Sequence, residues 1–285
     1  MGQTIACANQ KGGVGKTTTV VNLAADLALD GERVLVIDLD PQGNATSGFG
    51  IDRSSLDSTL YDVLLAGRPI GKSIVPTAIG GCALVPGSVA LAGAEVELAG
   101  VDQRERRLSR ALSEIVAAFD YVLLDCPPSL GLLTVNALTA ADSVLIPTQC
   151  EYYALEGLSQ LIATLNLVRD NLNPSLGIKG VVLTMYDART NLSADVASEV
   201  RTHFGAAVFE TVIPRSVRLS EAPSFGQPIA LYSRESRGAM AYAALADELR
   251  RRDGRVPSGD PQRSGETPVR TSAVETSALV ASSAR

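Results

Sequence analysis

The chain has 285 residues, of which 46% are hydrophobic and 20% charged, and its formal net charge is −6. This length and apolar content are enough to bury a full core, as one large or two small domains. The sequence pI of about 5.0 excludes a global basic field, so any contact with DNA must come from a local patch of cations.

The cysteines and the N-terminus indicate the cellular compartment. Cys7, Cys82, Cys126 and Cys150 are widely scattered and form no C-x-x-C pair. This spacing favours reduced thiols over a disulfide frame or a zinc site. No charged n-region and long apolar h-region open the chain, and no apolar run approaches the length of a membrane span. We therefore expect a soluble, cytoplasmic protein.

Hydrophobic periodicity predicts alternating strands and helices along most of the chain. Strands are expected at residues 3–9, 33–37, 82–85, 121–124, 143–146 (ending before Pro147), 180–184 and 207–212. Helices are expected at 16–29, 57–66, 103–118, 130–140, 154–171, 192–203 and 237–251. This alternation predicts one α/β domain with a doubly wound, mostly parallel sheet flanked by helices. Right-handed crossovers would bring the carboxyl ends of the strands, and hence the ligand, to one edge.

The composition changes beyond Arg252, and we assign residues 1–252 to the domain and 253–285 to a tail. Residues 254–285 are rich in Gly, Pro, Ser, Thr and Ala and contain no aromatic residue. Such a segment cannot bury enough apolar surface to offset its ordering entropy, so we expect the tail to be disordered.

Residues 10–18 read Gln-Lys-Gly-Gly-Val-Gly-Lys-Thr-Thr, between the first expected strand and the first expected helix. Strand, glycine-rich turn and helix is the context of a phosphate-binding loop. Glycines let main-chain N–H groups curl around phosphate oxygens, and the helix N-terminus favours the same anion. Lys16 would reach the β- and γ-phosphates, and the Thr17 hydroxyl would be a ligand of Mg²⁺. The expected nucleotide-binding residues here are Lys11, Gly12, Gly13, Val14, Gly15, Lys16, Thr17 and Thr18.

The loop departs from the usual G-x-x-x-x-G-K-[ST] pattern, because Gln10 stands where the first glycine belongs and a second lysine, Lys11, follows it. A loop with both lysines resembles the deviant Walker A of the ParA/MinD group of P-loop ATPases. The resemblance implies that Lys11 crosses a dimer interface and touches the phosphates of the partner's ATP.

Two carboxylates, Asp38 and Asp40, leave the end of a buried strand and enter the turn Pro41-Gln42-Gly43. Alone, such a pair is usually turn chemistry. Beside a phosphate loop the balance reverses, because hydrolysis needs an acceptor to orient the attacking water. The segment resembles the Walker A′ motif of the ParA family, which implies that Asp40 positions the water and Asp38 supports the metal. We therefore expect Lys11, Lys16 and Asp40 to be the catalytic residues.

The apolar strand at 121–124 is followed by Asp125, Cys126 and two prolines. This is the Walker B pattern, in which Asp125 would hold Mg²⁺ directly or through water. Pro127 and Pro128 forbid helix and make a stiff turn, suited to a switch that senses the γ-phosphate. Cys126 is interpreted as a packed residue, because the only histidine of the chain, His203, is not placed to activate it.

Residues 212–226 contain Pro214, Arg215 and Ser216 and resemble the ParA/Soj segment that encloses adenine. The strand end at Thr184 and Met185 is expected to form another wall of that pocket. Met185, Pro214, Arg215 and Ser216 are therefore further predicted nucleotide-binding residues.

The resemblance extends from residue 1 to about residue 250 and identifies the chain as a member of the chromosomal ParA (Soj-like) family. It implies an ATP- and Mg²⁺-dependent nucleotide-sandwich homodimer that binds DNA without sequence preference. A ParB-type partner would stimulate its slow ATP hydrolysis, and the protein would be cytoplasmic and nucleoid-associated. Candidate DNA contacts are Arg189, Arg215, Arg218, Arg234 and Arg237, of which Arg189 and Arg218 match basic positions of the Soj group.

Three alternatives stay open. A MinD-like ATPase would need an amphipathic, basic C-terminal helix, and the residues after 252 lack Phe, Trp and sustained amphipathicity, so we expect no stable membrane association. An iron protein of the nitrogenase type would need paired cysteines, and no second cysteine shares the context of Cys126. A ParA-like protein that positions another cargo is not excluded by the sequence, because the partner sets the cargo.

Overall fold

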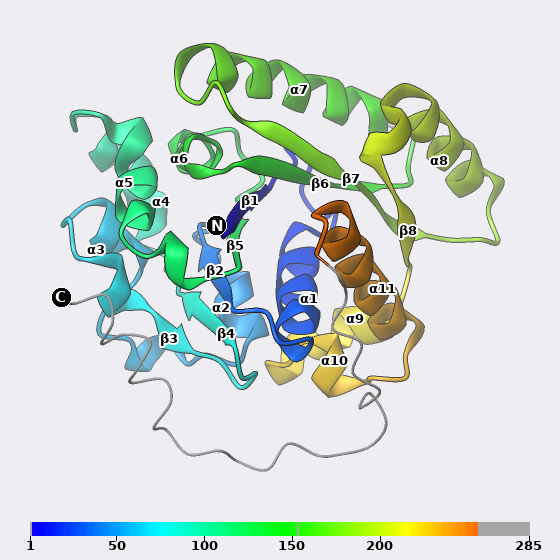
Figure 1. Ribbon diagram of the computed structural model, residues 1–285, viewed down its shortest axis with the longest axis horizontal. Helices are drawn as coiled ribbons and strands as arrows, with labels where there is room; N and C mark the ends of the chain where they lie inside the picture. Colours follow the sequence, from blue (N-terminus) through cyan, green and yellow to red (C-terminus); the bar gives the residue numbers. More distant parts are fainter. Residues whose placement is uncertain (1, 153, 256–285) are drawn as a thin grey trace.

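The computed structural model describes residues 2–152 and 154–255 (Figure 1). Within them, an eight-stranded sheet has the order β3-β4-β2-β5-β1-β6-β7-β8. Its strands are β1 (Gln3–Cys7), β2 (Val34–Asp38), β3 (Val75–Pro76), β4 (Cys82–Val85), β5 (Tyr121–Asp125), β6 (Ser143–Gln149), β7 (Gly177–Tyr186) and β8 (Val208–Pro214).

The central strands are parallel and buried, as their continuous apolar runs predict. All residues of β2 and β5 are buried, and the neighbours β5, β1 and β6 pair in parallel. Only β3 runs antiparallel, against β4. This two-residue strand at the edge of the sheet was not predicted, and Pro76 is tolerated there because an edge strand needs no second row of hydrogen bonds. The predicted doubly wound, mostly parallel sheet is confirmed.

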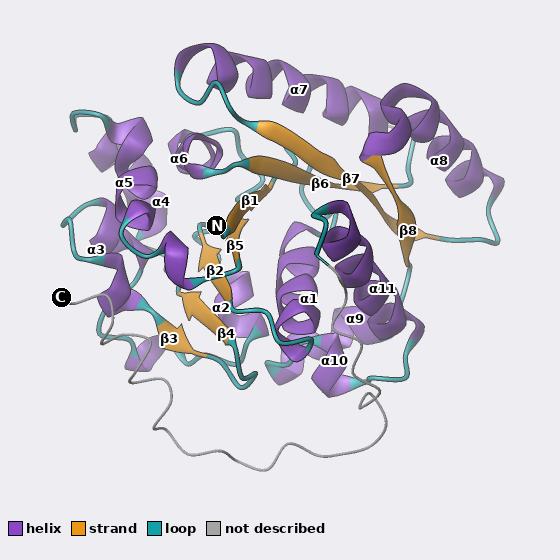
Figure 2. Cartoon of the chain, in the orientation of Figure 1, coloured by secondary structure: helices purple, strands orange, loops and turns teal. Residues whose placement is uncertain are grey.

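Helices cover both faces of the sheet, and each face has its own apolar core (Figure 2). One face packs against α1 (Lys16–Leu29), α2 (Asn44–Gly48), α9 (Val217–Glu221), α10 (Ile229–Tyr232) and α11 (Arg237–Arg252). The other packs against α3 (Leu60–Leu64), α4 (Leu91–Leu98), α5 (Arg107–Ser113), α6 (Leu132–Ala140), α7 (Ala154–Asn171) and α8 (Asn191–Phe204). The short helices α2, α4, α9 and α10 were not predicted, because none spans enough turns to show a helical period.

The helix expected at 103–118 is wrong as a single element. The chain forms a 3-10 turn at Arg104–Arg106, the helix α5, and a second 3-10 turn at Val116–Ala118. The side chain of Asn136 explains the first break, because it accepts a bond from Leu108 N and donates to Arg104 O, at 3.2 and 2.8 Å. A buried amide from another helix thus replaces hydrogen bonds that a continuous helix would make within itself.

The expected end of a strand before Pro147 is also wrong, since β6 continues to Gln149. Pairing of β6 with β1 stops at Leu145, whereas pairing with β7 continues past Pro147. At Pro147 the strand therefore has one neighbour, and the missing N–H leaves no partner unsatisfied. The helix expected at 57–66 is shorter, because Thr59 forms a capping box with Asp62 and so sets the start of α3.

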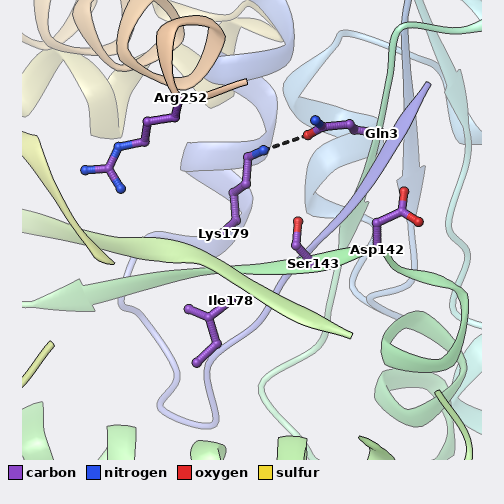
Figure 3. A pocket seen from close by; sticks show the side chains of 6 residues that line it. All are labelled: Gln3, Asp142, Ser143, Ile178, Lys179 and Arg252. Atoms are coloured by element: carbon purple, nitrogen blue, oxygen red, sulfur yellow. Dashed lines mark hydrogen bonds between the residues drawn. The ribbon is translucent and has the colours of Figure 1, made fainter. Parts of the chain in front are cut away.

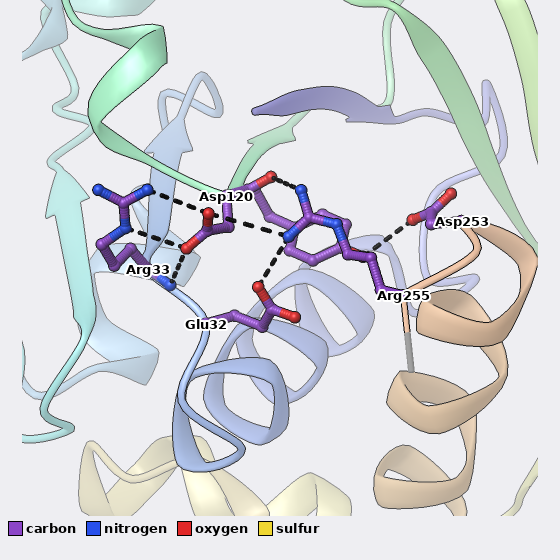
Figure 4. Close-up of polar contacts among 6 residues, drawn as sticks. Glu32, Arg33, Asp120, Asp253 and Arg255 are labelled. Atoms are coloured by element: carbon purple, nitrogen blue, oxygen red, sulfur yellow. Dashed lines mark hydrogen bonds and ion pairs between the residues drawn. The ribbon is translucent and has the colours of Figure 1, made fainter. Parts of the chain in front are cut away.

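The described chain ends in a polar clamp at the start of β5, where two residues of the predicted tail, Asp253 and Arg255, bind residues of the domain. The carboxylate of Asp253 is bound by Lys179 Nζ and, at 2.9 Å, by the hydroxyl of Tyr121. Arg255 pairs with Glu32 at 2.8 Å and lies over the Tyr121 ring (Figure 4). The folded body therefore extends to Arg255, three residues beyond the predicted boundary, and the rest of the predicted tail, 256–285, lies outside the described residues. No helix in the described ranges is long and apolar enough to cross a membrane.

Candidate nucleotide-binding site

The loop between β1 and α1 adopts the conformation that its glycines permit. Gly13 and Gly15 have φ of +74° and +87°, in the left-handed region that side-chain-bearing residues disfavour. Thr184, at the end of β7, anchors the loop by donating its hydroxyl to Val14 O at 2.9 Å. The ammonium of Lys16 folds back to Lys11 O at 3.1 Å, and the residue is only 6% exposed. The residues predicted to bind phosphate thus form one cradle at the N-terminus of the 14-residue helix α1.

Lys11 behaves differently from Lys16. Its ammonium points out of the loop to Glu151, just after β6, at 3.0 Å. Both side chains are substantially exposed, 37% for Lys11 and 45% for Glu151. Its main-chain N–H donates to Asn9, whose amide in turn holds Pro147 O. One lysine is therefore built into the cradle, and the other is directed outward from a fixed backbone.

The sheet register brings the two predicted metal-site carboxylates side by side. Asp38 pairs with Asp125 across β2 and β5, and both are fully buried. Burial raises the pKa of Asp125 well above its ordinary value, and the neighbouring charge of Asp38 raises it further. Neither oxygen of Asp125 has a hydrogen-bond partner of normal geometry among the described residues, although the nearby Thr17 hydroxyl opposes part of the rise. A buried carboxylate with so few partners fits a cation or an ordered water as its further ligand.

Asp38 is already bonded, in contrast to Asp125. Its Oδ2 accepts the N–H and the hydroxyl of Thr46, at 2.8 and 2.7 Å, and its Oδ1 accepts Asp40 N at 3.2 Å. Burial raises the pKa of Asp38 despite these three bonds. The Thr46 hydroxyl also accepts Gly87 N at 3.0 Å, so it joins the loop after β4 to this carboxylate. Asp38 can act on a cation by its charge, whereas Asp125 still has both oxygens to offer.

Asp40 lies on the turn that leaves β2, at the same edge of the sheet. It is 8% exposed, and its Oδ1 accepts Gln42 N at 2.8 Å. This bond fixes the carboxylate in an Asx turn beside the phosphate loop. Lys16, Thr17, Asp38, Asp40 and Asp125 are therefore brought to one edge, as the motifs predict.

The residues expected to enclose adenine lie on neighbouring strand ends. Tyr186 pairs with Pro214 across β7 and β8, and Arg215 N donates to Tyr186 O at 3.0 Å. Met185 adopts φ +51°, an unusual conformation for a side-chain-bearing residue, at this same end of β7. The backbone pairing thus brings the segments of Met185 and of Pro214, Arg215 and Ser216 together, and their contact with adenine stays a prediction.

The candidate DNA-contacting arginines lie in three segments: after β7, after β8, and before or at the start of α11. Arg189 is bound by both oxygens of Asp187, at 2.9 and 2.7 Å, and this contact lowers the pKa of that carboxyl. Arg218 pairs with Glu221 at 2.9 Å. Arg215, Arg234 and Arg237 are exposed. The two positions singled out by the Soj resemblance are thus solvent-facing, each with a carboxylate beside it.

The cysteines lie in the core, as expected. All four are free and buried, and Cys126 is 1% exposed. Burial raises the pKa of Cys126, which makes it a poor nucleophile. Among residues 2–152 and 154–255, no group of three or more His, Cys, Asp or Glu side chains is arranged to hold a metal alone. A cation at Asp125 would therefore need ligands from the nucleotide and from water.

Three residues of the site were missed by the sequence analysis: Thr46, Glu151 and Thr184 in its anchoring role. Glu151 reaches Lys11 across 140 residues, and Thr184 reaches Val14 across 170. Contacts at such separations leave no local pattern. Thr46 had a weak signal, because a Thr shortly after a Pro-Gln-Gly turn is typical of a helix start, where its hydroxyl finds main-chain or carboxylate partners.

Fold and site together define a P-loop nucleotide-binding protein of the deviant Walker A class. A family described as "AAA domain" matches residues 2–178. The chain is 57% identical over 249 residues to the sporulation initiation inhibitor protein Soj of Bacillus subtilis, covering 87% of this chain and 98% of that protein. It is 55% identical over 253 residues to the chromosome partitioning protein ParA of Myxococcus xanthus, covering 89% of each.

Among solved structures, a Mycobacterium smegmatis protein named cobyrinic acid a,c-diamide synthase, with bound ADP and magnesium, is 40% identical. It superposes with a TM-score of 0.78 and covers 92% of this chain and 100% of its own. The chain belongs to the ParA/Soj family of chromosome-partitioning ATPases.

Proposed function

We propose that this protein binds ATP and Mg²⁺, closes into a homodimer around the nucleotides, and in that state binds DNA without sequence preference. A ParB-type partner would stimulate its hydrolysis of ATP and so release it from DNA. The protein would then be cytoplasmic and nucleoid-associated, and its ATPase domain would span the predicted residues 1–252 together with the contacts that Asp253 and Arg255 add.

The different placement of the two loop lysines carries this proposal. Lys16 serves the cradle of its own protomer, because the residue is buried and its ammonium is bonded to Lys11 O within the loop. Lys11 is held outward on a rigid backbone, where a second protomer can meet it. A single-protomer ATPase has no use for a second, outward lysine in its phosphate loop, whereas a dimer that shares its nucleotides has one.

The carboxylates fit the chemistry of hydrolysis. Thr17 and the orphaned Asp125 would hold Mg²⁺, which supplies charge neutralisation for the phosphates when bound. Asp40 lies nearby in a fixed turn and would orient the attacking water. Asp38, buried beside Asp125, would keep the negative charge that favours a cation there.

The exposed arginines supply the local patch that the acidic chain requires. Dimer formation would double this patch, and two weak contacts on one rigid body bind far more tightly than one. ATP would thereby switch affinity for DNA without rebuilding either surface. Because phosphate contacts release counterions, binding should weaken steeply with salt.

Binding to a random-sequence DNA duplex tests the proposal, measured with ATP and Mg²⁺, with ADP, and without nucleotide, over a salt series. We expect tight, salt-sensitive binding only with ATP. Arg218→Glu should weaken it by about tenfold or more while ATP-dependent dimerisation persists. Arg110→Glu, a charge reversal at an exposed arginine of α5, is the matched control and should change little.

Two outcomes would contradict the proposal. Absence of DNA binding in every nucleotide state, together with ATP-dependent binding to anionic liposomes, would indicate a MinD-like membrane cycle. Equal loss of DNA affinity in Arg218→Glu and Arg110→Glu would show a general charge effect. It would mean that α9 is not part of the DNA-binding surface.

A further inference from the structure

We infer that Arg53 is a positioning residue for the hydrolytic carboxylate Asp40. The guanidinium of Arg53 donates to Gln42 O at 2.7 Å through Nη1 and to the Ser47 hydroxyl at 3.1 Å through Nη2. The same residue, Gln42, donates its N–H to Asp40 Oδ1 at 2.8 Å. One side chain therefore fixes the residue whose N–H orients the carboxylate.

The turn is shaped to receive this guanidinium. Gly43 has φ +63°, and a side chain there would place its Cβ 2.7 Å from Arg53 Nη1. A glycine thus leaves room for Arg53 to lie against the turn between Asp40 and α2. Any other residue at this position would be strained in backbone and would also displace the arginine.

Arg53 is itself held in place at both ends of its short segment. Asp52 caps the turn Arg53–Ser55, with its carboxylate accepting Ser54 N at 2.9 Å. Before it, Gly50 lies against Gly226, so close that a Cβ on Gly50 would lie 2.7 Å from Gly226 O. The base of Arg53 is therefore fixed to the body of the domain on one side and to its own cap on the other.

Folding alone does not explain these contacts. Arg53 is exposed, and exposed polar contacts of this kind add little to the stability of a domain. Their effect is local: the arginine ties the Asp40 turn to Ser47 of α2, the helix whose Thr46 binds Asp38. Both carboxylates that follow β2 are thus oriented from α2, Asp38 directly and Asp40 through Arg53.

This inference rests on the proposed function, in which Asp40 orients the attacking water. A carboxylate that orients a water must be held to a fraction of an ångström, and small misplacements reduce rates strongly. Arg53 touches neither the phosphate loop nor the buried pair Asp38–Asp125. Its loss should therefore slow hydrolysis without changing affinity for ATP.

The test compares full-length wild type, Arg53→Met, Arg53→Lys and Ser47→Ala by single-turnover release of phosphate from ATP, with excess protein, Mg²⁺ and DNA. We expect Arg53→Met to lower the rate about 5- to 30-fold, with Kd for ATP changed less than twofold. Arg53→Lys, which can reach only one of the two acceptors, should recover part of the rate. Ser47→Ala should have a smaller effect, and one that does not add to that of Arg53→Met, because both remove the same bond.

Arg68→Met is the matched control. Arg68 lies in the loop after α3 and, like Arg53, donates to a main-chain carbonyl, Asp57 O at 3.4 Å. It should hydrolyse ATP at the wild-type rate. Asp40→Ala separates the two levels of the argument. If Asp40→Ala is inactive and Arg53→Met is not impaired, the role of Arg53 is overturned. If Asp40→Ala hydrolyses ATP normally, the proposed mechanism itself fails. A fall in ATP affinity equal to the fall in rate would mean that Arg53 supports the fold of the site and not Asp40.

Discussion

Buried carboxylates at the two ends of strand β5 differ in their hydrogen bonds. At its start, the Tyr121 hydroxyl binds Asp253, whose carboxylate is 2% exposed and also paired with Lys179. At its end, Asp125 is fully buried with neither oxygen bonded among the described residues. A carboxylate from the end of α11 thus has its partners at the start of the strand, whereas the carboxylate at the end of the strand has no hydrogen bond of normal geometry among the described residues.

The hollows in the surface do not mark this difference. A hollow of about 380 Å³ lies at the completed end, lined by Gln3, Lys179 and Arg252 among others (Figure 3). Its cations are already bound: Lys179 lies 2.6 Å from Gln3 Oε1, and Arg252 pairs with Glu248 at 2.8 Å. The volume of this hollow alone would place a ligand at the edge of the sheet opposite the phosphate loop. The lack of hydrogen bonds to Asp125 among the described residues instead favours a ligand at the phosphate loop.

This contrast indicates that the carboxylate of Asp253 contributes to stability and that the carboxylate of Asp125 contributes to function. Removing one member of a completed buried pair destabilises the fold, because the other member is left buried and unpaired. An orphaned carboxylate destabilises the fold until a ligand arrives. The same substitution, aspartate to asparagine, should therefore have opposite effects at the two ends.

The largest effect is expected at the completed end. Asp253→Asn removes the charge that faces Lys179, whose side chain is only 12% exposed. We expect the free energy of unfolding to fall by about 2–4 kcal/mol in urea titration, because a buried cation loses its partner. Glu105→Gln, which breaks a partly exposed pair with Arg104, should change this free energy by less than about 1 kcal/mol. Equal changes in the two variants would mean that the clamp adds no more than a surface ion pair.

At the functional end the sign should reverse. Asp125→Asn removes a buried charge that has no hydrogen bond of normal geometry within the described ranges, so the nucleotide-free protein should gain about 1–2 kcal/mol of stability in the presence of a chelator. Because the folded protein raises the pKa of Asp125 above 3.8, the wild type loses stability as pH rises above about 4. The gain should therefore be larger at pH 8 than at pH 5. Destabilisation of Asp125→Asn at both pH values would show that Asp125 has structural partners. The proposed difference between Asp125 and Asp253 would then be wrong.

The motifs predicted the functional end and not the completed one. The glycines of the phosphate loop, Asp40 and Asp125 are local patterns, each readable within a few residues of a strand. The central parallel sheet followed from the same apolar runs. The fold was therefore accessible from the sequence, as was the grouping of these residues at one edge of the sheet, while their roles stay predictions.

The clamp was not accessible, because it joins residues far apart in the chain. Asp253 meets Lys179 across 74 residues and Tyr121 across 132. Asp253 and Arg255 fall in the predicted tail, whose assignment rests on composition, and composition describes the average of a segment and not its first three residues. The break in the predicted helix at 103–118 has the same origin, since Asn136 acts from another helix. What sequence patterns miss here are polar contacts between distant elements.

The smallest effect concerns Glu151. It lies at the edge of the phosphate loop, yet its carboxylate already has a partner, as the carboxylate of Asp253 has at the opposite edge. Its exposed ion pair with Lys11 must open before Lys11 can reach a second protomer. Exposed pairs contribute about 0.2–1 kcal/mol, so Glu151→Gln should lower the protein concentration for ATP-dependent dimerisation by about two- to fivefold. Sedimentation velocity with a non-hydrolysable ATP analogue measures this midpoint.

Glu156→Gln, an exposed acidic residue in the first turn of α7, provides the matched control and should leave the dimerisation midpoint unchanged. A shift of both variants would report only the lower negative charge of the protein. A higher midpoint in Glu151→Gln alone would mean that Glu151 guides Lys11 towards the partner. In that case the ion pair would belong to the dimer interface. The carboxylate of Glu151 would orient Lys11 towards the second protomer and would not hold it back.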